Sequence, residues 1–286
     1  MVIVGYVGYN AYQREGLKFR DPTTDKAYVA QTIEQQFSDK CSRHFDKINH
    51  CAERIKTGQS IVLLVGDSHV RHTYELIKGQ VANANHDLVA FSNGGCPFLI
   101  DVNTANVNDC ASENKEVMDF IKTNRALIKA IVLAGEFTTY TNPDWLKGIN
   151  GETTDVGGAL SRTLAQLQGR PVIMFEQVPP ISFDPKKCLS RPFRISRNNF
   201  NCQSSYSDVV AALEPSRKAI QKAIEPFSNV TLFNVDSALC GSGICSAVSN
   251  NHLLYYDKTH LNPIGVDFVR SHIDFDKALS AAMANH

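Results

Sequence analysis

The sequence lacks several features that would place it at once in a broad class of proteins. Its apolar start, residues 1–7, is far shorter than the ~20 residues of a membrane-spanning helix. That stretch also has no basic residues before it and no small-residue cleavage site, so no signal peptide is recognisable in it. Neither charge sign is in excess, with 29 lysines and arginines against 29 aspartates and glutamates. This balance gives no support for binding to nucleic acid.

The chain also lacks a Cys-x-x-Cys motif, and its close histidine pair, His69 and His72, has no third ligand nearby, so no metal site is expected. Its eight cysteines instead form short loops, which favours disulfides in an oxidising compartment over reduced core cysteines in a cytosolic enzyme. Sequence does not fix the connectivity. Pairing of neighbours predicts Cys41–Cys51, Cys96–Cys110, Cys188–Cys202 and Cys240–Cys245.

One stretch, residues 61–69, organises the rest of the chain. Five apolar residues, 61–65, predict a fully buried strand, and Gly66 then allows a sharp turn. A helix is predicted over residues 69–78, which places Ser68 between the carboxyl end of a strand and the amino end of a helix. Open α/β sheets bind ligands at this position. The alternative is that Ser68 serves only as a helix cap.

A second stretch near the other end carries Asp257 and His260. Residues three apart share a face of a helical turn, so the carboxylate can hold one imidazole nitrogen. The other nitrogen is then free to take a proton from a serine hydroxyl. Taken alone, His260 would be a surface or capping histidine, but together the two stretches supply a nucleophile, a base and an orienting group.

The pairing of Gly66-Asp67-Ser68-His69 with Asp257-x-x-His260-Leu261 resembles the SGNH (GDSL-like) hydrolase superfamily. Within it, the chain is most similar to the periplasmic SGNH domain that follows acyltransferase-3 membrane domains in bacterial O-antigen acetyltransferases. The resemblance implies Ser68 as nucleophile, His260 as general base and Asp257 as orienting carboxylate. The α/β-hydrolases are disfavoured because their Gly-x-Ser-x-Gly elbow is absent, Val70 standing two residues after Ser68.

The oxyanion hole is expected from backbone N–H groups. The resemblance implies the N–H of Gly95, or alternatively of Gly94, together with that of Ser68. The third block of the superfamily, Gly-x-Asn-Asp, is not matched, because Phe137 stands two residues after Gly135. Asn142 could substitute only if its loop folds back. Asp67 is expected to be a buried hydrogen-bond acceptor and His69 to lie in the first turn of the helix.

Five strands alternating with helices predict an α/β fold, a three-layer α/β/α sandwich around a five-stranded parallel sheet of flavodoxin-like order 2-1-3-4-5. The predicted strands are residues 61–65, 88–92, 130–134, 171–177 and 230–235, and the predicted helices include residues 116–129, 155–168 and 207–224. Residues 1–57 are predicted to be a linker and extension, with a helix over 28–37 and Cys51 on a second helical segment, and 58–286 to be the SGNH domain.

The resemblance implies an O-acetyltransferase domain that forms an acyl-serine and acetylates a cell-surface polysaccharide, the O-antigen of lipopolysaccharide. Its partners would be the acyltransferase-3 transmembrane domain of the same chain and the polysaccharide, with acetyl-CoA as ultimate donor and no cofactor bound by this domain. It would be a periplasmic domain of a bacterial inner-membrane protein, monomeric in isolation. A secreted carbohydrate esterase and a non-catalytic glycan-binding module are the alternatives. The basic loop over residues 181–206 is either a solvated loop or an acceptor-binding lid.

Overall fold

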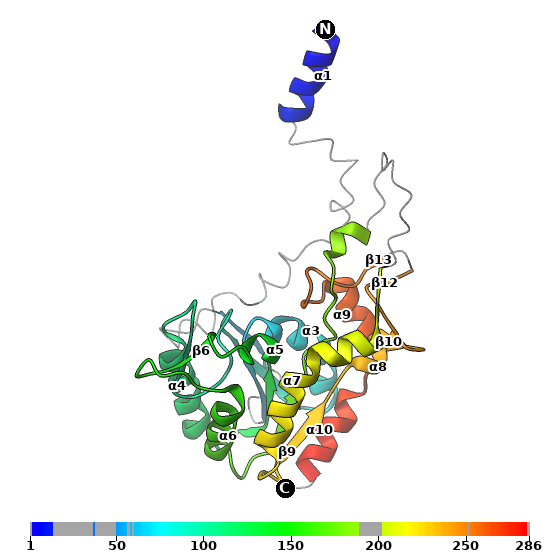
Figure 1. The fold of residues 1–286 in the computed structure, drawn as a ribbon. Coiled ribbons are helices and arrows are strands. Elements are labelled where there is room, and N and C mark those ends of the chain that lie inside the picture. The colour runs from blue at the N-terminus through cyan, green and yellow to red at the C-terminus, as the bar shows by residue number, and fades with distance from the viewer. Residues whose placement is uncertain are drawn as a thin grey trace.

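The structure of the protein is a computed structural model, and a central sheet of six strands forms its core (Figure 1). The structure describes residues 2–13, 37, 50–55, 58, 60–188, 202–250 and 252–284. The strand order is β1-β3-β2-β5-β7-β9, in which all pairs are parallel except β1 with β3. The strands are β1 (His50–Arg54), β2 (Ile61–Gly66), β3 (Asp87–Ser92), β5 (Ile128–Ala134), β7 (Val172–Phe175) and β9 (Val230–Phe233).

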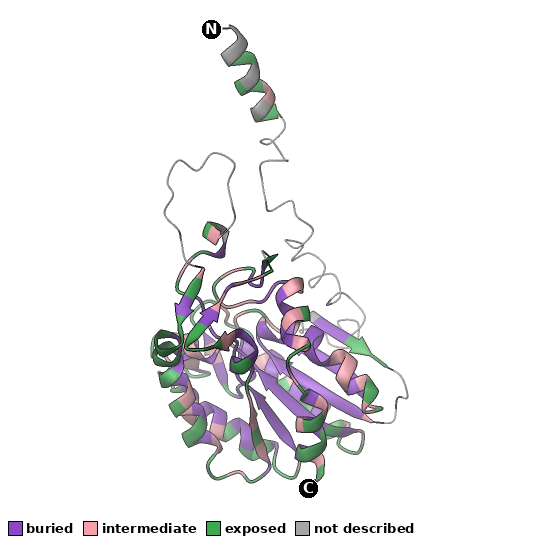
Figure 2. Ribbon diagram, turned by 90° about the vertical axis from the view of Figure 1, so that its right-hand side faces the viewer, coloured by how far each residue is buried: buried purple, intermediate pink, exposed green. Residues whose placement is uncertain are grey.

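Helices cover both faces of this sheet, which gives the expected three layers (Figures 1 and 2). Strand β2 shows why, because its side chains alternate between two buried clusters. Val62 and Leu64 pack against the helices of one face, which are α3 (His69–Asn83), α9 (Pro263–Arg270) and α10 (Phe275–Ala284). Leu63 and Val65 pack on the other face, which is covered by α4 (Cys110–Thr123), α6 (Val156–Gln166) and α7 (Tyr206–Ile224).

The α/β fold and the order of the five predicted strands are confirmed, but the predicted strand number is wrong. The sixth strand, β1, lies within the predicted extension and pairs antiparallel with the edge of the sheet, from His50 opposite Ser92 to Arg54 opposite Leu88. Cys51 therefore lies on a strand, and its predicted helical segment is wrong. A segment of five residues is too short for its alternation of polar and apolar residues to distinguish an edge strand from a loop or a helix.

The helix predicted over residues 116–129 is also displaced in the structure. Helix α4 begins at Cys110 and ends at Thr123, and Ile128 already belongs to β5. The apolar pair Leu127 and Ile128 fits a helix face as well as a buried strand, so the pattern alone placed the boundary too late. Helices α6 and α7 agree with the predicted ranges to within two residues.

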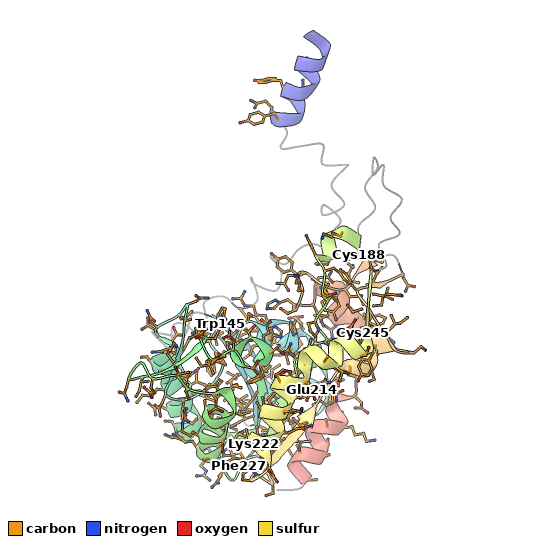
Figure 3. The ribbon with its side chains drawn as sticks, in the orientation of Figure 1. Trp145, Cys188, Glu214, Lys222, Phe227 and Cys245 are labelled. Atoms are coloured by element: carbon orange, nitrogen blue, oxygen red, sulfur yellow. A yellow bond between two sulfur atoms is a disulfide. The ribbon has the colours of Figure 1, made fainter. Side chains whose placement is uncertain are left out.

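A second, smaller layer of structure lies beside the sheet. It consists of 3₁₀-helix η4 (Pro185–Cys188), which lies in the predicted basic loop, and a three-stranded sheet of β10 (Cys240–Gly241), β11 (Ile244–Ser246) and β8 (Gln203–Ser205). Figure 3 labels Cys188 and Cys245 on this part of the molecule. The remaining short elements are β4 (Val102–Thr104) paired with β6 (Leu146–Gly148), β12 (Val248–Ser249) paired with β13 (His252–Leu253), α5 (Phe137–Tyr140) and α8 (Asp236–Leu239).

Three of the predicted disulfides are confirmed in the described part of the chain: Cys96–Cys110, Cys188–Cys202 and Cys240–Cys245. The pairing of Cys41 with Cys51 lies outside the described residues, as do residues 28–36 of the predicted helix and residues 189–201 of the basic loop. Helix α1 (Val2–Gln13) covers the apolar start of the chain. Among the described helices, none is long and apolar enough to cross a membrane.

A close approach of two strands explains why residue 66 is glycine. Gly66 has φ +151°, and a Cβ added there would lie 1.7 Å from the carbonyl oxygen of Ala134 on the neighbouring strand. The backbone at Ala134 cannot move aside without breaking the pairing of β2 with β5. That pairing positions the end of β2, which Ser68 follows. Only glycine therefore allows the strand to end where it does.

We expect Gly66→Ala to destabilise the fold by about 3 kcal/mol or more, because the clash is with backbone and the dihedral is strained. The measurement is the free energy of unfolding in urea. Gly79→Ala is the matched control, since Gly79 lies inside α3 with nothing within 4 Å of the added Cβ. That variant should gain about 0.5–1 kcal/mol from helix propensity. Equal stability of the two variants would contradict this account.

Candidate active site

The Ser68 side chain faces a histidine and does not cap its helix. Ser68 stands at the N-cap position of α3 with helical dihedrals, φ −57° and ψ −23°, and its hydroxyl makes no capping hydrogen bond. Its Oγ lies 2.8 Å from Nε2 of His260, a residue 192 positions away. The capping alternative for Ser68 is therefore wrong, and the structure brings the two predicted residues into hydrogen-bond contact.

Asp257 holds the opposite side of the His260 ring. Nδ1 of His260 lies 2.9 Å from Oδ2 and 3.0 Å from Oδ1 of Asp257. The segment is a bend and not the helical turn that the spacing predicts. Oδ1 of Asp257 accepts hydrogen bonds from the backbone N–H groups of Thr259 and His260, an Asx turn that brings residues three apart together. Ser68, His260 and Asp257 thus form one continuous chain of hydrogen bonds.

The loop that carries Asp257 and His260 is anchored to neighbouring segments. The N–H of Ile181 donates to the carbonyl of Lys258 at 2.9 Å, and the hydroxyl of Tyr255 donates to the carbonyl of Pro179 at 2.7 Å. The side-chain oxygen of Asn262 caps α9 by accepting from the N–H of Gly265, and its amide also donates to the carbonyl of Leu253. Both flanks of the loop are therefore fixed, which limits the positions available to the imidazole.

The charges of the site raise the pKa of His260 and lower that of Asp257. Burial alone would lower the pKa of His260, but the hydrogen bond and charge of Asp257, with the charges of Asp67 and Glu136, raise it above its ordinary value. Burial alone would raise the pKa of Asp257, but the same pairing and two backbone N–H groups lower it to about 2. The pair therefore favours an ionised carboxylate that stabilises a protonated imidazole.

Asp67 is buried and accepts three hydrogen bonds, as its predicted role requires. Oδ1 accepts from the N–H of His69 at 2.8 Å, and Oδ2 accepts from the N–H of Glu136 at 2.8 Å and the hydroxyl of Tyr140 at 2.9 Å. Burial raises the pKa of Asp67, and these donors oppose that effect. Sequence reasoning missed Glu136 and Tyr140 because their link to Asp67 spans about 70 residues and leaves no local pattern.

Gly94 and Gly95, the two glycines expected at the oxyanion hole, lie in a turn that follows β3. The N–H of Cys96 donates to the carbonyl of Asn93, and Gly95 at the third position of that turn has φ +77°, which favours glycine. In the described structure, the N–H groups of Ser68, Gly94 and Gly95 donate to no protein acceptor. They remain available to a ligand atom.

The first turns of α4 hold this glycine turn in place. The disulfide between Cys96 and Cys110 joins the end of the turn to the first residue of the helix. The amide of Asn114 donates to the carbonyls of Pro97 and Leu99, at 2.8 and 2.9 Å, and the amide of Asn93 donates to Glu113. The turn is thus fixed by covalent and polar contacts from one helix end.

No side-chain donor occupies the position of the third block. Phe137 is buried at the start of α5 and has no polar atom. Asn142 is exposed, and its Oδ1 accepts from the N–H of Asp144 within a local turn. The candidate donors to an oxyanion are therefore the free backbone N–H groups beside Ser68 and in the glycine turn.

Comparison with known proteins agrees with the sequence resemblance. A family model described as "SGNH domain (fused to AT3 domains)" matches residues 36–275. The periplasmic domain of a lipopolysaccharide acetyltransferase from Salmonella ser. Paratyphi A superimposes with a TM-score of 0.56 at 16% identity, covering 88% of this chain and 97% of that one. This likeness shows a common fold.

A salicylyl-acyltransferase of a tetracycline biosynthetic pathway superimposes more weakly, with a TM-score of 0.40 at 14% identity over 80% of this chain and 56% of that one. No sequence among the curated proteins matches the chain.

We expect covalent labelling of Ser68 by a fluorophosphonate to accelerate with pH through a midpoint above 6.5, the ordinary pKa of histidine. The reason is that only neutral His260 can take the serine proton, and Asp257 favours its protonated form. Asp257→Asn should move the midpoint to lower pH, because burial then acts without the carboxylate. Mass spectrometry over a pH series measures the labelling rate.

The control for this measurement is Asp267→Asn, the same change at an exposed carboxylate paired with Arg270. It should leave the midpoint where it is in the unaltered protein. A midpoint unaffected by Asp257→Asn would show that this carboxylate does not set the titration of His260.

Proposed function

Because the chain belongs to the family of SGNH domains fused to AT3 domains, we propose that it is an O-acetyltransferase domain. It moves an acetyl group through an acyl-serine on Ser68 to a sugar hydroxyl of a cell-surface polysaccharide, the O-antigen of lipopolysaccharide. The observation that carries the proposal is the chain of hydrogen bonds from Ser68 through His260 to Asp257. This arrangement of hydroxyl, imidazole and carboxylate serves acyl transfer on several unrelated folds.

Transfer begins when Nε2 of His260 takes the proton of the Ser68 hydroxyl. The oxygen attacks the acetyl carbonyl carbon of the donor and forms a tetrahedral intermediate with a negative oxygen. His260 gives its proton to the leaving group as the bond to the donor breaks, which leaves acetyl-Ser68. His260 then takes the proton of the sugar hydroxyl, which attacks the acyl-serine, and finally returns a proton to Ser68. Asp257 orients the imidazole and stabilises its protonated form throughout.

The oxyanion of each tetrahedral intermediate is stabilised by backbone donors in this mechanism. The free N–H groups of Ser68 and Gly95 fulfil the role, with that of Gly94 as the alternate, and Ser68 also lies at the amino end of α3, where the helix dipole favours negative charge. With Phe137 in place of a side-chain donor, the site has one fewer donor than Gly-x-Asn-Asp would give. Removing one such donor lowers a rate by ~10²–10³.

The donor and the compartment follow from the family rather than from this domain alone. An AT3 membrane domain of the same chain would pass acetyl groups outward from acetyl-CoA, and this domain would receive them in the periplasm of a bacterial inner-membrane protein. The Salmonella structure with the same fold is named as the periplasmic domain of a lipopolysaccharide acetyltransferase. Disulfides at three places agree with an oxidising compartment.

We expect Ser68→Ala, His260→Ala and Asp257→Ala each to abolish polysaccharide acetylation by the full-length protein in cells, with losses of about 10⁶-fold for Ser68 and His260 and about 10⁴-fold for Asp257. Acetyl groups on the extracted polysaccharide are counted by NMR. Unfolding curves of the isolated domain should be close to that of the unaltered protein. Ser280→Ala, an exposed serine on α10, is the matched control. Full acetylation by any triad variant would remove that residue from the mechanism.

We expect the isolated domain to hydrolyse small acetyl esters to acetate only slowly. When a sugar acceptor is added, we expect faster cleavage of the ester, with the acetyl group transferred to the sugar. A domain built for transfer must keep its acyl-serine from water until the acceptor arrives. The assay follows acetate release and acetyl-sugar formation in parallel. Rapid hydrolysis independent of acceptor, near the ~10 s⁻¹ of typical enzymes, would instead identify a secreted carbohydrate esterase. No labelling of Ser68 at all would identify a glycan-binding module.

A further inference from the structure

We propose that His69 is a positioning residue of this site, whose neutral ring packs against His260 and stabilises it when it carries the proton of Ser68. The inference rests on the proposed function, because it concerns the same proton transfer. It assigns a role to a side chain that sequence analysis placed only in the first turn of a helix.

Two buried histidine rings of α3 lie against the partly exposed ring of His260. The ring of His69 lies 4.5 Å from that of His260, centroid to centroid, at an interplanar angle of 58°. The ring of His72, one turn further along α3, lies 4.8 Å from His69 but 5.9 Å from His260. His69 and His72 are 1% and 2% exposed. Of these two rings, His69 is in the closer contact with His260.

The polar atoms of His69 are left without partners in the described structure. Neither Nδ1 nor Nε2 makes a hydrogen bond, although both are buried. A neutral imidazole carries one donor and one acceptor, and burying them without partners destabilises the fold. A leucine or phenylalanine at this position would avoid that cost. Stability of the resting fold therefore does not explain a histidine here. A gain that appears only when the neighbouring ring becomes charged does explain it.

The surroundings keep His69 neutral, as this role requires. Burial, and then the charges of His72 and His260, lower the pKa of His69 well below its ordinary value. The amino end of α3, where His69 begins the helix, also disfavours positive charge. Burial likewise lowers the pKa of His72 to about 3. Two neutral rings thus face His260 from α3.

Carboxylates surround His260 on its other sides. Asp257 hydrogen-bonds its ring, and the charges of Asp257, of Asp67 just after β2 and of Glu136 at the start of α5 all raise its pKa. A cation within about 6 Å of an aromatic ring is attracted to the π-electrons, and more strongly in a buried site. At 4.5 Å the ring of His69 lies well within that distance, whereas the ring of His72, at 5.9 Å, lies at its limit. His69 therefore favours the protonated form of His260, the form that also arises when His260 takes the serine proton.

The test compares His69→Leu with His72→Leu in the isolated domain. Both variants make the same change on the same helix at equally buried positions, but only His69 is in close contact with His260. We expect His69→Leu to slow labelling of Ser68 by about tenfold and to lower the pKa of His260 by about half a unit to one unit. His72→Leu should change the labelling rate by less than about twofold and the pKa of His260 by less than about 0.3 unit. The KM for a small acetyl ester should stay the same in both.

Nitrogen-15 NMR of the histidine rings reads the pKa of His260 without substrate, so it is independent of whether the protein transfers acetyl groups. Labelling of Ser68 in the unaltered protein tests the proposed function separately. An unchanged pKa of His260 in folded His69→Leu would overturn the role of His69, and so would an equal shift in His72→Leu. If His69→Leu does not fold, the unaltered protein still decides, because His69 must stay neutral throughout the titration of His260. Protonation of His69 within that range contradicts the proposal.

Discussion

The carboxylate of Asp67 is the contact on which the arrangement of the site depends. Burying a charge is costly unless hydrogen bonds satisfy it, and Asp67 has three donors from separate places: the start of α3, the end of β5 and helix α5. Each donor is thereby fixed relative to the strand end that carries Ser68. The neighbouring constraint is Gly66, which lets β2 approach β5 closely enough for these groups to meet.

Much of the fold could be predicted because the buried strands are short, apolar and bounded by turn residues. The five parallel strands and their order follow from alternation with helices, and three disulfides follow from pairing cysteines within 14 residues or fewer. Strand β1 was missed because its pairing with β3 is a long-range contact and its sequence, His-Cys-Ala-Glu-Arg, has little β propensity. The small sheet beside the main one was missed because its strands have only two or three residues, too few to show a pattern.

Some residues of the site could likewise be predicted from short sequence patterns, whereas others are brought to it only by the fold. Ser68, Asp257 and His260 stand in short recognisable patterns, and the structure brings all three together. The spacing of Asp257 and His260 suggested a helical turn, whereas an Asx turn achieves the same approach with the aspartate side chain itself. Tyr140 and Glu136 reach the site from a segment with no distinctive spacing, so only the folded chain shows them.

The direction of β1 sets the edge at which the polypeptide enters the sheet. The five other strands of the sheet all point their carboxyl ends toward Ser68. Because β1 runs the opposite way, its first residue, His50, lies opposite Ser92, at the same edge as those carboxyl ends. A parallel sixth strand would have brought the polypeptide in at the far edge. The polypeptide therefore joins the sheet at the same edge as Ser68. In the proposed reaction, a domain that supplies acetyl groups from upstream would be connected to the edge where the acyl-serine forms.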